Sequence, residues 1–168
     1  MERDNVFTTT TFKKIEIDPF KERFPWIGGD LQTLRDTFIS ENIPIKSGQK
    51  IHIAVPKIPN GLGGEGQLLA LLNCPTTPLI KGVVLMLHGL GGSSRRRGLR
   101  RMAYKLLDAG FAVLRLNLRG ADPGRDLAAG TYSAKCNSDL IPVIIYARNV
   151  CTQLRNKSEN HKVSLPLF

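Results

Sequence analysis

The segment from Lys81 to Ser94 constrains the fold of this chain more than any other. It reads Lys-Gly-Val-Val-Leu-Met-Leu-His-Gly-Leu-Gly-Gly-Ser-Ser, so an unbroken apolar run over 83–87 meets a His-Gly pair, further glycines and two serines. Such a run is typical of a strand that is buried on both faces of a parallel sheet. Glycines after it let the backbone turn sharply and leave N–H groups facing a ligand. The segment therefore predicts a central strand over 83–88 that ends in an anion-binding turn.

An amphipathic helix over residues 94–108 is predicted directly after this turn. Ser93 or Ser94 supplies a side chain that caps its first turn, and Gly110 follows its end. Its apolar face is formed by Leu99, Met102, Ala103, Leu106 and Leu107. A further strand is predicted over 111–117. In open α/β sheets, this order of strand, turn and helix predicts a ligand site at the carboxyl end of the strand.

The remaining elements are predicted more coarsely. Strands are expected over 36–45 and 49–55, and the alternation of apolar residues in the second turns His52 toward solvent. Glycine and proline make Pro56 to Leu79 an irregular region. A helix is expected from Ser138 to about Asn156. Its buried stripe is formed by Leu140, Ile144, Ala147, Cys151 and Leu154.

Three interpretations of the turn at 88–94 follow from the residues alone. The first is a plain tight turn with a hydrogen-bonded His88. The second is a nucleotide-binding turn, although Gly89-Leu-Gly-Gly-Ser-Ser94 lacks the third glycine of G-x-G-x-x-G. For that reading, the following strand ends in Asn117 rather than a ribose-binding acid, yet Asn117 and Arg119 suit a phosphorylated ribose. The third is an oxyanion turn, because His-Gly-x-Gly at the end of a strand resembles that of α/β-hydrolases.

Four motifs occur in a fixed order and together carry a more specific resemblance. They are Phe-Pro-Trp-Ile-Gly-Gly-Asp-Leu-Gln-Thr-Leu at 24–34, the turn at 88–94, Leu-Asn-Leu-Arg-Gly at 116–120 and Tyr-Ser-Ala-Lys-Cys-Asn-Ser-Asp-Leu at 132–140. In this order they resemble the YheT-type branch of the α/β-hydrolase superfamily, over about residues 20–168. The chain departs from that family at Asp30 and Ser133, where the family usually has histidine. Neither position is the nucleophile, so the departures concern local contacts.

The resemblance implies an α/β fold, namely the amino-terminal part of an α/β-hydrolase fold with a mostly parallel sheet and flanking helices. Residues 1–35 are then a lead segment, and residues 36–168 are a partial α/β-hydrolase domain. The implied reaction is acyl transfer from a carboxylic ester or lipid-like substrate to water, as in esterases and lipases, without a cofactor or metal. The implied oxyanion turn consists of His88, Gly89, Leu90, Gly91 and Gly92, with the Leu90 N–H as one donor. The implied pocket residues are Asn117, Arg119, Gly120 and Tyr132.

The catalytic serine motif of this fold, G-x-S-x-G, does not occur in the 168 residues. Val163 to Phe168 resembles the strand that leads into that motif, and the triad acid and histidine follow later still in the superfamily. We therefore expect the fold to be truncated before the nucleophile elbow and the chain to be inactive alone. A complementary carboxyl-terminal fragment is an expected partner. The alternative is a non-catalytic α/β domain that binds a ligand without turning it over.

The net charge of +10 is partly concentrated in one cluster, Arg95, Arg96, Arg97, Arg100 and Arg101. This cluster is either a solvated basic face of the helix or a surface that attracts anionic substrates and lipid head groups of a membrane. Nucleic acid is not an expected partner, because the cluster has no interleaved aromatic residues. The three cysteines form no C-x-x-C pair, which argues against a zinc site. The first residues lack a secretory signal, so a cytoplasmic location is expected.

Overall fold

The computed structural model describes residues 19–22, 24–38, 43–59, 62–157 and 164–168. The chain divides into two compact units, Met1–Ser40 and Glu41–Phe168. In the first unit the described residues include helix α1, Gly28–Phe38, which carries Asp30 in its first turn. A carboxylate there is favourable, because the first N–H groups of a helix are positively polarised. The carboxylate of Glu22 also accepts a hydrogen bond from the Gly28 N–H at 3.1 Å.

The second unit is built on a mixed four-stranded sheet with the order β1-β2-β4-β3. Its strands are β1 (Gln49–Val55), β2 (Gly66–Asn73), β3 (Val83–Met86) and β4 (Ala112–Leu116). β2 lies antiparallel to both β1 and β4, whereas β3 and β4 are parallel. Two short 3-10 helices, Arg125–Leu127 and Ala134–Asp139, lie in the connection after β4.

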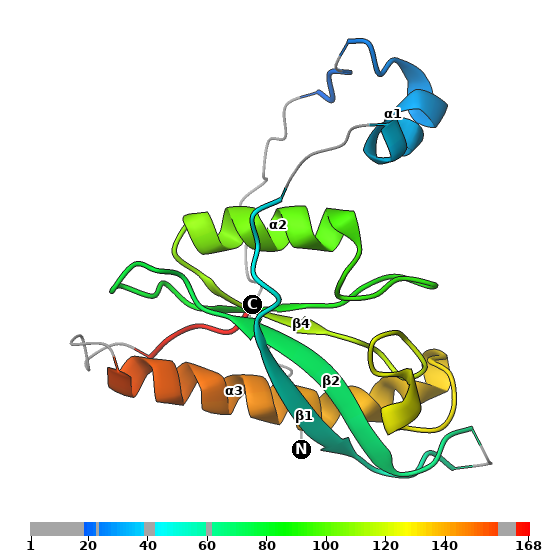
Figure 1. Cartoon of the computed structure of the whole chain (residues 1–168), viewed down its shortest axis with the longest axis vertical. Helices are drawn as coiled ribbons and strands as arrows, with labels where there is room; N and C mark the ends of the chain where they lie inside the picture. The colour runs from blue at the N-terminus through cyan, green and yellow to red at the C-terminus, as the bar shows by residue number, and fades with distance from the viewer. Residues whose placement is uncertain (1–18, 23, 39–42, 60–61, 158–163) are drawn as a thin grey trace, which may run out of the picture. The chain divides into compact units, whose positions relative to one another are not determined.

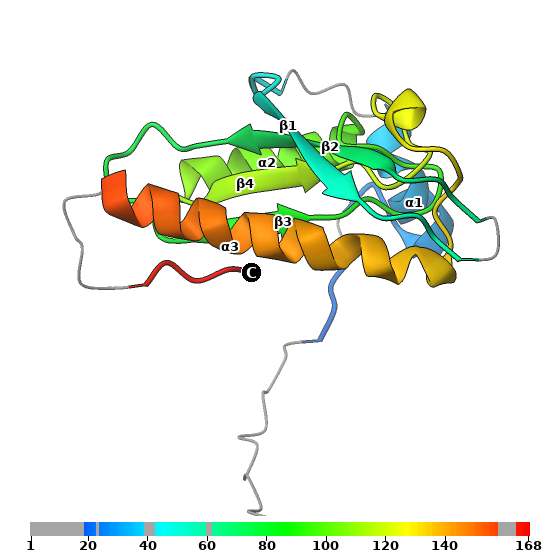
Figure 2. The same cartoon turned by 90° about the horizontal axis from the view of Figure 1, so that it is seen from below.

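Two helices cover the opposite faces of this sheet. α2 (Arg97–Asp108) lies on one face and α3 (Leu140–Lys157) on the other (Figures 1 and 2). The main core forms beneath α3, where apolar residues of β1, β2 and β4 pack against Val143 and Ala147. A second cluster joins Val83 and Ala112 to Val150, Cys151 and Leu154. In the part of the chain that is described, no helix is both long and apolar enough to cross a bilayer.

The last residues of the chain run alongside β3, on the edge that β4 leaves open. Val83 and Leu167 form a parallel bridge. The Val83 N–H donates to the Pro166 carbonyl at 2.9 Å, and the Leu85 N–H donates to the Phe168 carbonyl at 2.8 Å. The strand predicted over 83–88 is therefore observed over 83–86, between β4 and the final segment. The α/β fold class is confirmed as well, but the sheet is mixed rather than mostly parallel: in the described part of the chain, parallel pairing is confined to these three segments.

The prediction of a strand over 36–45 is wrong. Residues up to Phe38 belong to α1, residues 43–48 have no regular structure, and 39–42 lie outside the described residues. Leu-Gln-Thr-Leu-Arg favours helix after an acidic first turn. The irregular region predicted from Pro56 to Leu79 is also partly wrong, because it contains β2. Four of the eight residues of β2 are leucine, a residue that does not by itself indicate a strand.

The two long helices differ from their predictions at their starts and in their buried stripes. α2 begins at Arg97 rather than at 94, and neither predicted serine caps it. Met102, predicted on its apolar face, is 56% exposed, whereas Ala103 is fully buried. In α3 the predicted core residue Ile144 is exposed, and Val143 and Val150 are buried instead. Packing against the sheet decides which residues of each helix are buried. Sequence periodicity alone leaves the position of the buried face uncertain by one residue.

Candidate functional site

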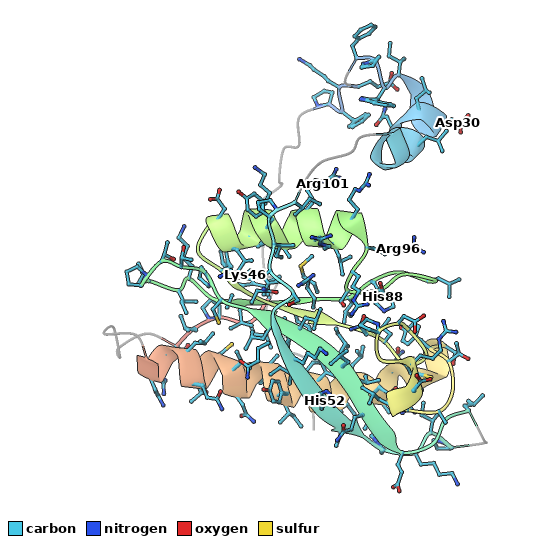
Figure 3. All side chains as sticks on the ribbon, viewed as in Figure 1. Asp30, Lys46, His52, His88, Arg96 and Arg101 are labelled. Atoms are coloured by element: carbon cyan, nitrogen blue, oxygen red, sulfur yellow. The ribbon has the colours of Figure 1, made fainter. Side chains whose placement is uncertain are left out.

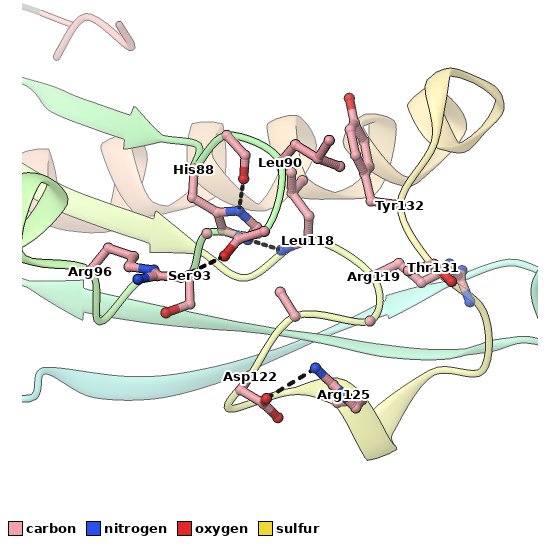
Figure 4. A pocket seen from close by; sticks show the side chains of 15 residues that line it. His88, Leu90, Ser93, Arg96, Leu118, Arg119, Asp122, Arg125, Thr131 and Tyr132 are labelled. Atoms are coloured by element: carbon pink, nitrogen blue, oxygen red, sulfur yellow. Dashed lines mark hydrogen bonds and ion pairs between the residues drawn. The ribbon is translucent and has the colours of Figure 1, made fainter. Parts of the chain in front are cut away.

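A cavity of about 630 Å³ lies beyond the carboxyl ends of β3 and β4. Because the two strands are parallel, the segments that follow them leave the sheet at the same edge, where α/β proteins bind ligands. The cavity is lined by the turn after β3, residues 88–93, and by Arg96 at the start of α2. Residues 118–122, Arg125 and the pair Thr131 and Tyr132 complete its wall (Figure 4).

The turn after β3 is closed by a hydrogen bond from the Gly92 N–H to the Gly89 carbonyl at 3.0 Å. Gly91, its third residue, has a φ of +65°, as in a type II turn, where this left-handed conformation favours glycine. The Arg96 guanidinium donates to the Gly91 carbonyl at 3.0 Å and holds the turn from the helix side (Figures 3 and 4). Leu90 lies at the tip with its side chain 98% exposed. Within the described residues, the Leu90 N–H donates to no protein acceptor.

His88 fixes this turn to the neighbouring strand. Its imidazole is buried, and Nε2 accepts a hydrogen bond from the Leu118 N–H at 3.0 Å. A ring nitrogen that accepts carries no proton in a neutral imidazole, so the proton is on Nδ1. Nδ1 lies 2.8 Å from the Gly89 carbonyl and donates to it. Both ring nitrogens are therefore occupied, and His88 is placed as a brace of the turn.

Asn117 lies beneath the turn rather than in the wall of the cavity. It is 1% exposed, its Oδ1 accepts from the Ser94 N–H at 2.9 Å, and its Nδ2 donates to the Leu69 carbonyl at 3.0 Å. The amide therefore links the start of the α2 region to β2. Oδ1 and Nδ2 both bond to protein groups, and Asn117 does not line the cavity.

Arg119 is buried and all five of its guanidinium N–H groups have acceptors. Nε and one Nη bind the two carboxylate oxygens of Asp139, each at 2.9 Å. The other three donors bind the carbonyl groups of Pro56, Gly64 and Ala129. The hydrogen bond and charge of Asp139 raise the pKa of Arg119 above its ordinary value, despite its burial. Arg119 thus ties the connection between β1 and β2 to the connection between β4 and α3, and its guanidinium is fully engaged there.

Gly120 and Tyr132 form the side of the cavity opposite the turn. Gly120 has a φ of +75°, and a Cβ on it would lie 2.9 Å from the Gly130 carbonyl oxygen, so only glycine fits. The Tyr132 N–H donates to the Arg119 carbonyl at 2.9 Å, which keeps the two segments together. The Tyr132 side chain points toward the space between its own segment and Leu90 (Figure 4).

The structure thus brings together eight of the nine residues that the sequence analysis placed at the site. His88, Gly89, Leu90, Gly91, Gly92, Arg119, Gly120 and Tyr132 line the cavity, and Asn117 does not. Sequence reasoning missed Leu118 and the acceptor role of Asp139. Asp139 stands 20 residues from Arg119, and no local signal links the two.

The serines next to the turn are not placed as nucleophiles. Ser94 is fully buried and its Oγ has no hydrogen-bond partner. Ser93 Oγ accepts from the Arg95 N–H at 3.3 Å. In the described part of the chain, no hydrogen bond joins a serine to a histidine, which a serine nucleophile requires for activation.

Comparison with solved structures identifies this unit as part of an α/β-hydrolase fold. A soluble variant of monoglyceride lipase from Saccharomyces cerevisiae, solved with a substrate analogue, matches 76% of this chain at 18% identity and a TM-score of 0.52. An alpha-beta serine hydrolase homologue from Coxiella burnetii matches 65% of it at 21% identity and a TM-score of 0.44. A serine hydrolase without a lid from Xanthomonas campestris matches 63% at 20% identity and a TM-score of 0.45.

The chain spans less than half of each of these proteins, namely 37%, 49% and 47% of their lengths. No protein-family model matches the sequence, and no curated protein matches it. The match to the monoglyceride lipase, at 18% identity, therefore shows a shared fold and nothing further.

Proposed function

We propose that the turn at 88–92 is one side of an oxyanion hole in a hydrolase of carboxylic esters. The observation that carries this proposal is the Leu90 N–H, which donates to no described protein group at the edge of the 630 Å³ cavity. A backbone N–H held in place before the reaction stabilises the negative charge of a tetrahedral intermediate. His88 fixes the turn through both ring nitrogens, so the donor needs no reorganisation when that charge develops.

The rest of the machinery is proposed to lie on the other side of β3. The segment ending at Phe168 runs parallel to β3, which is where the resemblance to the YheT-type branch expects the strand before the nucleophile. In that branch the second oxyanion donor comes from the residue after the serine. No residue that lines the cavity is assigned as the catalytic serine, acid or base. A complementary carboxyl-terminal segment is the proposed source of all three.

The cavity suits an ester of moderate size. Its volume of about 630 Å³ falls within the range of about 300–1,000 Å³ that small-molecule sites occupy. Leu90, Leu118 and Tyr132 give it apolar surface for an acyl or alkyl group. Arg96 adds positive charge at its border, which favours a substrate with a polar or anionic end, whereas the charge of Arg125 is paired with Asp122 in the same wall.

A nucleotide-binding role is less well supported by the same geometry. That interpretation relied on Asn117 and Arg119 as ligands of a phosphorylated ribose. Asn117 is occupied by Ser94 and Leu69, and Arg119 has no N–H left to donate. Binding a nucleotide through these side chains would break the contacts that hold the turn and the loops in place.

The proposal is tested by following the Leu90 N–H directly. We would titrate the nitrogen-15-labelled chain with methyl butyrate and with butyrate, a model ester and its acid product, and record amide spectra. We expect saturable shifts of the Leu90 and Gly91 resonances and smaller shifts at Tyr132. Shifts confined to residues outside the cavity, or their absence at saturating ligand, would overturn the proposal.

Two variants separate the N–H from the side chain of the same residue. Leu90→Pro removes the N–H, and the second position of a type II turn accepts proline. Leu90→Ala keeps the N–H and shortens the exposed side chain. We expect Leu90→Ala to bind butyrate like the parent chain and Leu90→Pro to lose most of the binding. Equal binding by both variants would show that the N–H is not a ligand.

A further inference from the structure

A second cavity lies on the α2 face of the sheet and shares no lining residue with the first. Its volume is about 260 Å³, below the range of about 300–1,000 Å³ typical of drug-sized ligands. Four of its lining residues are cationic, Lys50, Arg95, Arg100 and Arg115, and none of the described lining residues is acidic. Leu69 and Leu71 form an apolar part of the wall. Such a concentration of one charge sign around a small hollow creates a strong positive potential.

Arg115 is the central group of this cavity. It lies on β4 and is 2% exposed, although it stands in an otherwise apolar strand. Its guanidinium donates to the carbonyl groups of Ser94 and Ser47, at 2.9 and 3.2 Å, and to Asn73 Oδ1 at 2.9 Å. All three acceptors are neutral. Its Nε is buried and has no hydrogen-bond partner.

The contrast with Arg119 shows what Arg115 lacks. Both arginines are buried at or just beyond β4, but Arg119 binds the carboxylate of Asp139 and uses all five donors. Arg115 has no carboxylate among its described partners. Burial, and secondarily the charge of Arg100, lower the pKa of Arg115 below its ordinary value. A buried cation without a counter-charge is unfavourable, and an anion beside it would relieve this.

We propose that this cavity binds a small oxyanion, either inorganic phosphate or the phosphate of a phosphomonoester. A phosphate oxygen accepts from several guanidinium groups at once, and two or more cations match its double negative charge. Arg100 is held toward the cavity by a hydrogen bond to the Ile43 carbonyl at 3.2 Å. Lys50 and Arg95 also line the cavity and are exposed to solvent. The apolar wall leaves room for the first carbon atoms of an ester group.

The binding test uses isothermal titration calorimetry on the 168-residue chain in a dilute chloride buffer. The titrants are sodium phosphate and glycerol 3-phosphate, and a separate arm uses vesicles of phosphatidylcholine with and without phosphatidic acid. We expect saturable binding of both soluble compounds that weakens as salt is added. Saturable binding to phosphatidic acid vesicles alone would assign the same site to a lipid head group, provided that the variants below abolish it. Absence of saturable binding in every arm would overturn the proposal.

A matched pair of variants separates the cavity from the general positive charge of α2. Lys50→Ala/Arg95→Ala removes two exposed cations that line the cavity, and it should weaken binding by about tenfold or more. Lys105→Ala/Arg97→Ala removes the same charge from α2 positions that do not line it, and it should change binding by less than about twofold. If both double variants weakened phosphate binding equally, the proposal would be overturned, and diffuse electrostatic attraction of phosphate to the basic surface would explain the binding.

A second readout reports on Arg115 itself. In nitrogen-15 spectra the Arg115 Nε–H, which has no protein partner, should shift on addition of phosphate. Sodium chloride at the same ionic strength should not shift the Arg115 Nε–H resonance. If Arg115 served only to tie Ser47, Asn73 and Ser94 together, its Nε–H would not respond to phosphate.

Discussion

His88 Nε2 accepts a hydrogen bond from the Leu118 N–H at 3.0 Å, so the residues that follow β3 are tied to those that follow β4. Both residues are buried, at 8% and 5% exposure. The same imidazole donates to the Gly89 carbonyl at the start of the turn. One side chain therefore sets the position of the turn relative to the cavity wall formed by Leu118 and its neighbours.

The first prediction follows from this bond. His88→Ala leaves the buried Leu118 N–H without an acceptor, and we expect it to lower the free energy of unfolding by about 1–3 kcal/mol. Denaturant unfolding followed by circular dichroism measures this change. His52→Ala is the control, because His52 is exposed on β1 and its imidazole bonds, among the described residues, only to the Gln67 side chain. Equal effects of the two substitutions would contradict the bracing role of His88.

The second prediction concerns the ion pair between Arg119 and Asp139, whose side chains are 0% and 3% exposed. Asp139→Ala leaves a buried guanidinium without its carboxylate, and we expect a loss of about 3–5 kcal/mol in the free energy of unfolding. Asp122→Ala removes a carboxylate from an exposed pair with Arg125, where the side chains are 63–72% exposed. Such surface pairs contribute about 0–1 kcal/mol, so this variant should be near the parent. A small effect of Asp139→Ala would mean that Arg119 finds other acceptors.

Local sequence patterns predicted those elements whose own residues indicate their secondary structure. The apolar run at 83–87 and the glycines after it correspond to β3 and its turn, and the alternation of Ile51, Ile53 and Val55 corresponds to β1. β2 was missed because Gln-Leu-Leu-Ala-Leu-Leu has no strand periodicity and stands between glycine- and proline-rich segments. It is a strand because β1 and β4 pair with it on both sides. Such pairing joins residues far apart in the sequence, which local propensity does not report.

For the site, the sequence located the polar residues but not the direction of their side chains. Asn117 and Arg119 were expected in the cavity wall, yet their amide and guanidinium groups point to acceptors within the protein. The acceptors lie 10–63 residues away along the chain, and no motif contains both partners. No sequence pattern singled out Arg115, because it is one polar residue in a strand that is otherwise apolar.

The third prediction concerns thiol reactivity and pH. Burial raises the pKa of the Cys151 thiol above its ordinary value of 9.0. A thiol whose pKa is higher in the folded state stabilises the fold below the unfolded pKa, and this contribution is lost as pH rises through the folded pKa. We therefore expect iodoacetamide to modify the exposed Cys74 well before Cys151 at about pH 8, and stability to fall above about pH 9. Mass spectrometry of the alkylated peptides distinguishes the two sites. Equal rates at Cys74 and Cys151 in the folded chain would contradict the burial of Cys151.

The last prediction is that the 168-residue chain does not hydrolyse short-chain nitrophenyl esters. Turnover through an acyl-enzyme needs a serine hydrogen-bonded to a base, and the described residues contain no such pair. The proposed oxyanion donor alone binds the substrate carbonyl without supplying a nucleophile. The assay compares nitrophenyl butyrate hydrolysis by the purified chain with the rate in buffer, before and after treatment with a serine-directed phosphonate. Turnover that the phosphonate abolishes would contradict this prediction. Peptide mapping of the phosphonate label would then identify the serine, and Ser93→Ala and Ser94→Ala would be the first variants to assay.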